Sequence, residues 1–282
     1  MNNKIILFIF LLIGITTSCF ASVTSVGVSN VGAGIETGKI KKLLTVGDSI
    51  TAGVGGDGDA DDSNDWGYRK HLQDILGIGT YKFVGSVNRP SSDATYDVAN
   101  WGNSGQIIQW MVSSAGPTNG IKYELNRSFT NGTIDSVVLI HAATNDVILQ
   151  SIDAGNKRTN AQIIADMNLL IDAVVAFNPN AKIYVALIVP NRTAGQATWW
   201  VPFNTDLKAA MLTRRGTTPN MHIVDMYSAF VDDYFGDCAG DWYNICMNVF
   251  SGSHPADKGY QTMAKMWARC MADSTAVGCD GN

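Results

Sequence analysis

Residues 136–146 read SVVLIHAATND, and this stretch decides the fold class. Its first five residues are a short apolar run rich in β-branched side chains, which is the pattern of a strand buried on both faces. Small and polar residues follow at once. In open parallel sheets, sites lie just beyond the carboxyl ends of the strands. The stretch therefore predicts a buried parallel strand that leads directly into a functional site.

Further strands and helices alternate on both sides of this segment. Apolar runs predict strands, and apolar residues at helical spacing, bounded by proline, predict helices. This alternation is typical of a three-layer α/β sandwich, a central parallel sheet with helices on both faces. No internal repeat is apparent, so residues 40–282 are expected to form one domain. We expect strands at 43–46, 81–87, 136–140, 182–189 and 221–224, and helices at 66–76, 161–177 and 255–270.

The composition excludes several classes of protein. Of 282 residues, 46% are hydrophobic and 16% charged, whereas disordered chains are poor in apolar residues and highly charged. Glycine (28) and proline (7) show no period, which excludes a collagen-like fibre. The net charge of −5 offers no basic surface for nucleic acid or an anionic membrane.

The N-terminus has the pattern of an export signal. Lys4 precedes an apolar run at 5–15, and small residues then lead to a cleavage position after Ala21. We therefore expect a signal peptide at 1–21 and a secreted protein, extracellular or periplasmic. Residues 22–39 are rich in Ser, Gly and Val without helical period, which is typical of a linker or irregular lead-in.

Two other interpretations of this segment stay open. One is a retained membrane anchor, although the run is shorter than the ~20 residues that span a bilayer. The other is a lipoprotein signal with Cys19 as the lipidated residue, although Thr16 stands where Leu is usual. Neither changes the expectation that the folded domain is not inserted in a membrane.

Cleavage after Ala21 leaves four cysteines, and an even number in an exported chain predicts two disulfides. Four cysteines allow three connectivities. The simplest pairs sequence neighbours, Cys238–Cys246 and Cys270–Cys279. Metal binding is the weaker interpretation, because neither pair has C-x-x-C spacing.

Four clusters of small and polar residues lie next to the predicted strands or before the last helix. They supply a hydroxyl group, amide donors and an imidazole, which are the groups that acyl transfer needs. They read GDSIT at 47–51, ANWGNSG at 99–105, HAATND at 141–146 and SHPADKGY at 253–260.

In this order the clusters resemble the four blocks of the SGNH, or GDSL, hydrolase family. The resemblance runs from about residue 43 to 267 and implies a flavodoxin-like α/β fold. It is closest to the carbohydrate acetylesterase branch, which includes the acetyl xylan esterases. Segments similar to that branch are GYR at 67–69, FVGS at 83–86, TND at 144–146, VDM at 224–226 and HPADKGY at 254–260.

The resemblance implies a role for each block. Ser49 corresponds to the nucleophile and His254 to the general base that takes its proton. The backbone N–H groups of Ser49 and Gly105 and the side-chain amide of Asn145 correspond to the oxyanion hole. Gly102 is the rival to Gly105, because the block contains two glycines. No metal and no organic cofactor is implied.

Only one of the four histidines is expected to be catalytic. His71 lies in a helical pattern and His222 in a strand pattern. His141 follows a strand and is near enough to line the site, but we expect it to fill a structural position. His254 is therefore the candidate base.

The chain departs from the family at two positions. Ala143 stands where glycine usually precedes Thr-Asn-Asp, a small change from which we expect little effect. The second change is larger. The family's acid normally lies three residues before the histidine, and that position is Ser251.

Three explanations for the missing acid stay open. The enzyme is a Ser–His dyad supported by a main-chain carbonyl, or Asp237 or Asp241 substitutes from the cysteine-bounded segment, or activity is lost. Asp257 follows His254 by three residues, beyond a proline, and is expected to be a cap or surface residue.

Two weaker signals concern ligands. Residues 57–62 have a D-x-D-x-D pattern but lack the Gly and Glu of an EF-hand, so a solvated acidic loop is expected instead of a calcium site in this segment at 57–65. Aromatic residues expected in loops are candidates to stack on sugar rings or to pack in the core; they are Trp199, Trp200, Trp242 and Tyr243.

The main hypothesis is a secreted serine esterase that removes acetyl or similar short acyl groups, with a small-molecule or polysaccharide ester such as xylan as substrate. A GDSL lipase or lysophospholipase uses the same chemistry but needs an apolar acyl groove. A non-catalytic carbohydrate-binding relative is the alternative from another class. The sequence does not specify an oligomeric state.

Overall fold

The structure, a computed structural model, describes most of the predicted domain. The described residues are 41–55, 66–88, 93–113, 120–129, 136–152, 158–192, 196–248 and 252–282. The predicted signal peptide, the linker and the acidic segment at 57–62 lie outside them, so those expectations stay predictions.

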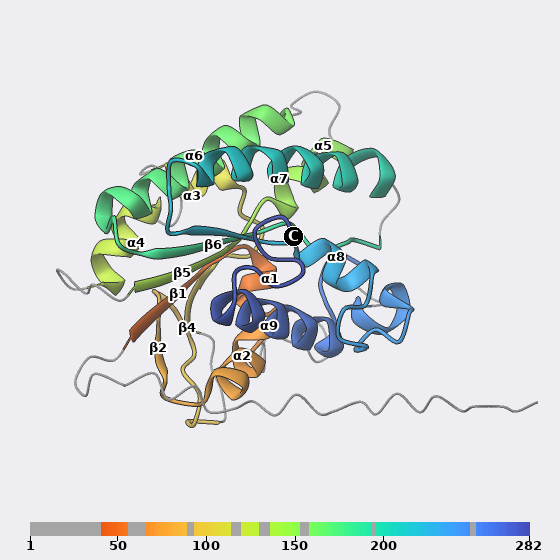
Figure 1. Cartoon of the computed structure of the whole chain (residues 1–282), viewed down its shortest axis with the longest axis horizontal. Coiled ribbons are helices and arrows are strands. Elements are labelled where there is room, and N and C mark those ends of the chain that lie inside the picture. The colour runs from red at the N-terminus through yellow and green to blue at the C-terminus, as the bar shows by residue number, and fades with distance from the viewer. Residues whose placement is uncertain are drawn as a thin grey trace, which may run out of the picture. The chain divides into compact units, whose positions relative to one another are not determined.

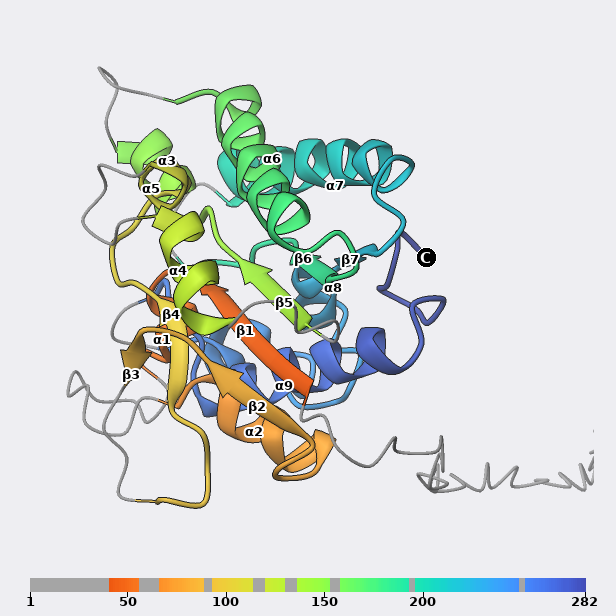
Figure 2. The same ribbon diagram turned by 90° about the vertical axis from the view of Figure 1, so that its left-hand side faces the viewer.

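A seven-stranded sheet forms the centre of the domain. Its order is β3-β4-β1-β5-β6-β7, and β2 pairs additionally with β1 (Figure 2). All pairs are parallel except β3–β4. The strands are β1 (Lys41–Gly47), β2 (Tyr81–Val84), β3 (Val87–Asn88), β4 (Ala99–Gly102), β5 (Ser136–His141), β6 (Lys182–Ala186) and β7 (Met221–Val224).

Two strands share one edge of β1, which the sequence did not predict. The first half of β1 pairs with β2, and its last two residues pair with β4. The expected single strand at 81–87 is interrupted at Gly85, where φ is +149° and a Cβ would lie 2.1 Å from the Asn100 carbonyl oxygen. The backbone of β4 therefore occupies the place where β2 would have continued.

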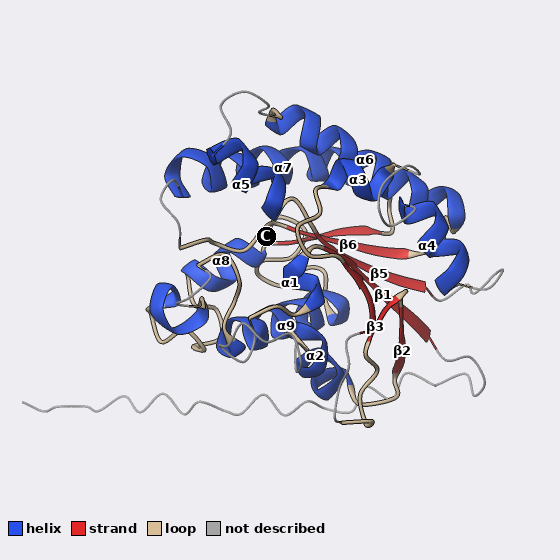
Figure 3. Ribbon diagram, turned by 180° about the vertical axis from the view of Figure 1, so that it is seen from behind, coloured by secondary structure: helices blue, strands red, loops and turns tan. Residues whose placement is uncertain are grey.

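Helices cover both faces of the sheet, as predicted (Figures 1 and 3). α3, α4, α5, α6 and α7 pack on one face, and α1, α2, α8 and α9 on the other. The helices are α1 (Ser49–Ala52), α2 (Tyr68–Leu76), α3 (Ile108–Val112), α4 (Gly120–Ser128), α5 (Thr144–Ile152), α6 (Asn160–Phe177), α7 (Val201–Arg215), α8 (Met226–Val231) and α9 (Asp257–Ala272), with π-helical turns η2 (Gln196–Trp200) and η3 (Trp242–Cys246).

The side chains of β5 alternate between the two faces of the sheet and are apolar on both, so each face must be covered by helices. Val138 and Ile140 belong to the core under α3–α7, whereas Val137 and Leu139 belong to the core under α2, α8 and α9. Successive side chains of a strand point to opposite faces, so a continuous apolar run requires apolar partners on both.

α6 is the longest described helix, and its ends follow from local sequence. Thr159 and Gln162 form a capping box at its start. Its end at Phe177 precedes Asn178-Pro179, because the residue before proline avoids helical geometry. Among the described residues it is the one helix with the length and hydropathy of a membrane span, but it buries six side chains in the core.

The two cysteine pairs are joined as the local pairing predicts, Cys238–Cys246 and Cys270–Cys279. The second disulfide ties the segment after α9 to the helix. That segment runs along β7: Asp280 N–H donates to Ile223 O (2.9 Å), and Ile223 N–H donates to Asp280 Oδ1 (2.9 Å). It therefore covers the last strand of the described sheet, whose hydrogen-bonding groups would otherwise be exposed.

We expect Cys270→Ser combined with Cys279→Ser to lower the free energy of unfolding by about 2–3 kcal/mol, because a loop of about ten residues is freed in the unfolded chain. Urea unfolding measures this loss. The matched double variant, Cys238→Ser with Cys246→Ser, should lower the free energy of unfolding by a similar amount. Only the Cys270/Cys279 double variant should have faster amide exchange at Ile223. Equal exchange at Ile223 in both double variants would contradict the edge-covering role.

Candidate active site

Ser49 lies at a tight turn beyond β1. A Cβ on Gly47 would lie 2.1 Å from His141 O and 2.3 Å from Thr51 Oγ1, so only glycine fits there. The next residue, Asp48, caps α1 by accepting a hydrogen bond from Ile50 N–H (3.0 Å). Ser49 is thereby the first helical residue, at the carboxyl end of the strand.

The structure brings Ser49 and His254 together. His254 Nε2 lies 2.7 Å from Ser49 Oγ, although the two residues are 205 positions apart. With Nε2 unprotonated, the serine hydroxyl donates to it, which is the arrangement in which a general base removes the proton of a nucleophile. Ser49 is 9% exposed, so most of the residue is shielded from solvent.

The segment that carries His254 is fixed by contacts that the sequence did not predict. Asn248 N–H donates to His254 O (2.9 Å), and Asn248 Nδ2 donates to Gly55 O (2.9 Å). Tyr260 O–H donates to Val54 O (2.7 Å). A Cβ on Gly55 would lie 3.1 Å from His254 Cβ. These contacts fix the turn that follows α1 relative to the segment that carries His254.

The geometry favours Gly105 over Gly102 as the backbone oxyanion donor. Gly102 N–H donates to Asn100 Oδ1 (2.8 Å), and a Cβ on Gly102 would lie 2.3 Å from Ala52 N, so this glycine is needed for packing. Gly105 is exposed, has φ +75°, and a Cβ there would meet nothing within 4 Å. Glycine at 105 is therefore a conformational requirement and not a packing requirement.

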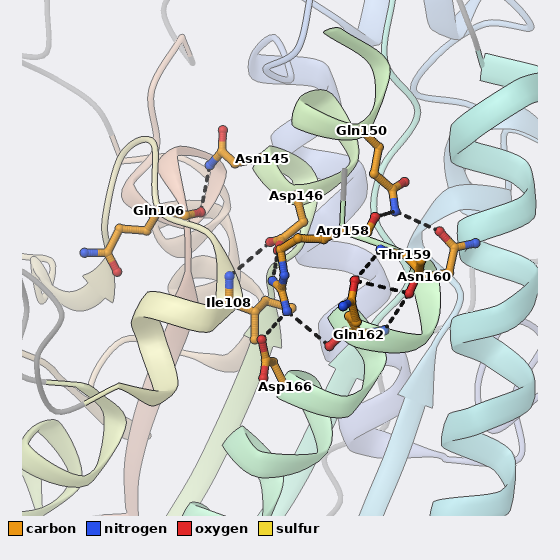
Figure 4. A network of polar contacts seen from close by, with 10 residues as sticks. All are labelled: Gln106, Ile108, Asn145, Asp146, Gln150, Arg158, Thr159, Asn160, Gln162 and Asp166. Atoms are coloured by element: carbon orange, nitrogen blue, oxygen red, sulfur yellow. Dashed lines mark hydrogen bonds and ion pairs between the residues drawn. The ribbon is translucent and has the colours of Figure 1, made fainter. Parts of the chain in front are cut away.

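Asn145 lies in the first turn of α5, beyond β5, and is half-buried. Its Nδ2 donates to Gln106 O (2.9 Å), as Figure 4 shows. An amide nitrogen carries two hydrogens, so one remains for a ligand. The hydrogen bond joins Asn145 to the residue that follows Gly105, which places the second and third predicted oxyanion donors side by side.

Burial perturbs two carboxyl groups next to these donors. Desolvation raises the pKa of Asp48 to about 7, and it raises the pKa of Asp146 to about 6. Asp48 lies beside Thr144, so the residue before the nucleophile and the residue before Asn145 are in contact. Asp146 has no role predicted from the sequence, although it belongs to the same block as Asn145.

His141 is structural, as expected. It is fully buried, and its Nε2 accepts a hydrogen bond from Val189 N–H (3.3 Å). Desolvation lowers the pKa of the imidazole to about 4, which keeps it neutral. Among the described residues, no group of three or more His, Cys, Asp or Glu side chains is arranged to hold a metal ion.

The candidates for the missing acid have other partners. Ser251 lies outside the described residues. Asp237 accepts from Thr262 Oγ1 (3.1 Å) and pairs with Lys265 Nζ (2.5 Å). Asp241 caps η3 by accepting from Asn244 N–H (3.2 Å) and Nδ2 (2.9 Å). Within the described part of the chain, neither carboxylate is brought together with His254.

Asp257 is a surface residue, as expected from its position after the proline. His71 Nε2 lies 2.8 Å from its carboxylate, and the Asp257 side chain is 60% exposed. The hydrogen bond with His71 lowers the pKa of Asp257. This carboxylate joins α9 to α2 on the outside of the domain and does not orient His254.

Ala143 has a backbone conformation that the sequence did not predict, while its effect on activity stays a prediction. Ala143 is fully buried and has φ +93°, a backbone conformation that favours glycine. Ala143 lies at the turn from β5 into α5, where its carbonyl oxygen accepts from Val147 N–H (3.0 Å). The alanine therefore carries backbone strain directly before the Asn145 turn.

A serine and a histidine in hydrogen-bond contact at the carboxyl edge of a parallel sheet define a serine-type hydrolase on a three-layer α/β scaffold. The GDSL-like lipase/acylhydrolase family model matches residues 45–262. The chain belongs to this family, whose members are carboxylic ester hydrolases. No curated protein sequence matches the chain.

Solved structures with a similar fold include carbohydrate esterases. A family 3 carbohydrate esterase from Clostridium thermocellum has a TM-score of 0.59 at 22% identity, covering 83% of this chain and 96% of that one. A family 3 carbohydrate esterase from Talaromyces cellulolyticus has a TM-score of 0.60 at 22% identity, with 83% and 97% covered. An acetylxylan esterase from Geobacillus stearothermophilus has a TM-score of 0.55 at 17% identity, with 83% and 95% covered.

We expect Ala143→Gly to raise the free energy of unfolding by about 1 kcal/mol, because relief of the positive φ outweighs the greater entropy of unfolded glycine. Chemical denaturation measures the gain. Ala142→Gly is the matched control, since Ala142 is equally buried but has no positive φ, and it should be destabilising. A loss of stability in both variants would refute the strain at Ala143.

We expect Asp237→Asn and Asp241→Asn to keep kcat/KM for a short-chain ester within about twofold of wild type, because their carboxylates hold α9 and η3 and not the imidazole. Asp237→Asn should instead lower stability through the loss of the Lys265 pair. Steady-state kinetics and thermal unfolding measure the two effects. A loss of a hundredfold or more in kcat/KM for either variant would identify that residue as the displaced acid.

Proposed function

We propose that this protein is a secreted serine esterase that removes acetyl or similar short acyl groups from a carbohydrate, with a polysaccharide such as xylan as substrate. The observation that carries the proposal is the 2.7 Å contact between His254 Nε2 and Ser49 Oγ. Gly105 and Asn145 follow β4 and β5, the parallel neighbours of β1, at the same edge of the sheet, which supports acyl transfer over a binding role alone.

In the proposed reaction, Ser49 Oγ attacks the ester carbonyl while His254 takes the hydroxyl proton. The negative charge that develops on the carbonyl oxygen is stabilised by the N–H groups of Ser49 and Gly105 and by Asn145 Nδ2. Each such donor contributes roughly 3 kcal/mol in the transition state. His254 returns the proton to the leaving sugar hydroxyl, and water then hydrolyses the acyl-serine by the same steps.

One exposed aromatic side chain, Tyr243, is linked through Arg192 to the segment that carries His254 and supports a carbohydrate substrate. Tyr243 is 42% exposed, and the Arg192 guanidinium lies 4.2 Å from its ring centroid. Arg192 N–H also donates to Gly252 O (2.7 Å), two residues before His254. Aromatic rings with adjacent planar polar groups suit the apolar face and the hydroxyls of a sugar.

The other aromatic candidates are core residues or pack against the core. Trp200 is fully buried at the end of the π-helical turn η2, so the structure supports core packing, one of its two predicted alternatives, and corrects its placement in a loop. Trp199 packs on the core under α7, and Trp242 packs on the core under α9. Tyr243 is therefore the residue of the four that is offered to a ligand.

Two further observations support the finer parts of the proposal. The neighbours in fold include esterases whose names specify carbohydrate or acetylxylan. The two disulfides suit an oxidising compartment outside the cytosol, as the N-terminal segment predicts.

A panel of esters from acetyl to long-chain, with acetylated xylan beside it, tests the proposal. We expect turnover that is highest for acetyl esters, and Ser49→Ala should abolish both turnover and labelling by an organophosphonate. Ser228→Ala on α8 is the control and should keep both. Preference for long chains would favour a lipase, and glycan binding without turnover or labelling by the wild-type protein would favour a non-catalytic relative.

A further inference from the structure

Two adjacent residues of α5 hold the segment that carries Gly105. Asn145 Nδ2 bonds to Gln106 O (2.9 Å), and Ile108 N–H donates to Asp146 Oδ2 (3.0 Å). These contacts fix the segment at two points, one on each side of Ile107 (Figure 4). The distance between the Gly105 N–H and the Asn145 amide, two of the three proposed oxyanion donors, is set by this pair of hydrogen bonds.

Asp146 can hold Ile108 only with support from Arg158. The Asp146 side chain is fully buried, and its second oxygen, Oδ1, accepts from Arg158 Nη1 (2.5 Å). Both carboxylate oxygens therefore face N–H donors. A proton on either oxygen would displace one donor, so the arrangement requires the ionised carboxylate, which burial disfavours and the guanidinium favours.

Arg158 is itself held in place by α6. Its Nη2 donates to Gln162 O (3.1 Å) and pairs with Asp166, and its carbonyl accepts from Gln150 Nε2 (2.6 Å). A planar guanidinium can bond two carboxylates at once, which a lysine ammonium does less well. The network runs from α6 through Arg158 and Asp146 to the Gly105 segment.

We propose that Arg158 is a positioning residue of the oxyanion hole, which fixes the Gly105–Ile108 segment relative to Asn145 by holding Asp146. The inference rests on the proposed esterase function. The Arg158–Asp146 ion pair would then affect the reaction rate without contacting Ser49 or His254.

Arg158→Met is expected to lower kcat for an acetyl ester by about tenfold, equivalent to ~1.4 kcal/mol of transition-state stabilisation, with KM within about twofold. Arg158→Lys should fall between Arg158→Met and wild type. The control is Arg214→Met, because Arg214 of α7 also pairs with an aspartate of another helix, Asp172 of α6, whose side chain is more exposed than that of Asp146. It should lose stability but keep kcat.

The pH profile separates positioning from general destabilisation. The charged groups that face Asp146 are Arg158, Asp166 on α6 and Asp48 before α1. Of these, only Arg158 lowers the pKa of Asp146, so its removal should move the acidic limb of kcat/KM to higher pH. Arg214→Met should leave that limb in place.

A double-mutant cycle with Asp146→Asn tests the route. If Arg158 acts through Asp146, Arg158→Met should cost little further kcat in the Asp146→Asn background. Full additivity of the two losses would overturn the proposal, and so would an equal loss of kcat in Arg214→Met.

A readout without substrate keeps the inference separate from the proposed function. Amide exchange of the Gly105–Ile108 segment should be faster in Arg158→Met than in wild type and in Arg214→Met. Absence of ester turnover in the wild type would refute the esterase, whereas unchanged exchange in Arg158→Met would refute the positioning role.

Chemical rescue adds a third measure. Arg158 lines an open cavity of about 280 Å³, so Arg158→Ala leaves a space that a small cation can reach. Guanidinium at low millimolar concentration should restore part of kcat to Arg158→Ala and none to Arg214→Ala. Equal response of the two variants would count against a specific site for the guanidinium.

Discussion

Close backbone packing at the carboxyl end of β1 is the constraint on which the site depends. The strand ends against β5 on one side and β4 on the other, and its last residue, Gly47, has no space for a Cβ beside His141 O. Gly102 meets the backbone of Ala52 as closely. At both glycines the neighbouring backbone leaves no space for a side chain. The turn after β1 is therefore held in place by backbone contacts, and these contacts fix the position of Ser49 relative to the ends of β4 and β5.

The other site residues are brought to this point by topology and polar contacts. β1, β4 and β5 are parallel neighbours, so the segments that follow them meet at one edge, where Ser49, Gly105 and Asn145 lie. His254 comes from the opposite end of the chain and is fixed by hydrogen bonds from Asn248 and Tyr260 to the turns around it. The buried carboxylates Asp48 and Asp146 cost solvation energy, and each uses that position to hold a backbone N–H next to the site.

The sequence predicted what depends on local pattern. The pattern of apolar residues predicts β5 and α6, because burial selects residue types over a continuous stretch. The blocks around Ser49 and His254 are recognisable because their functional residues lie close together in the sequence. α7 was missed although Phe203, Leu207 and Met211 have helical spacing, because Gly, Pro and Trp residues before it resemble a loop.

Features that depend on contacts distant in sequence were not predictable. The strain at Ala143 needs a backbone angle, and the split pairing of β1 needs the position of β4. Asp237 is a candidate for the displaced acid because it is next to Cys238 in sequence. In the structure its carboxylate instead accepts hydrogen bonds from Thr262 and Lys265. The pair between Asp146 of α5 and Arg158, which precedes the N-cap of α6, is marked by no motif in the sequence.

The segment after α9 protects an edge of the sheet from pairing with other chains. Its hydrogen bonds to Ile223 occupy the open side of β7, and the Cys270–Cys279 bond holds it there. Displacement of this segment would leave backbone groups of β7 unpaired, and an unpaired strand edge is a template for pairing with another strand. The disulfide that keeps this segment in place thereby acts against strand pairing between chains as well as for the stability of one chain.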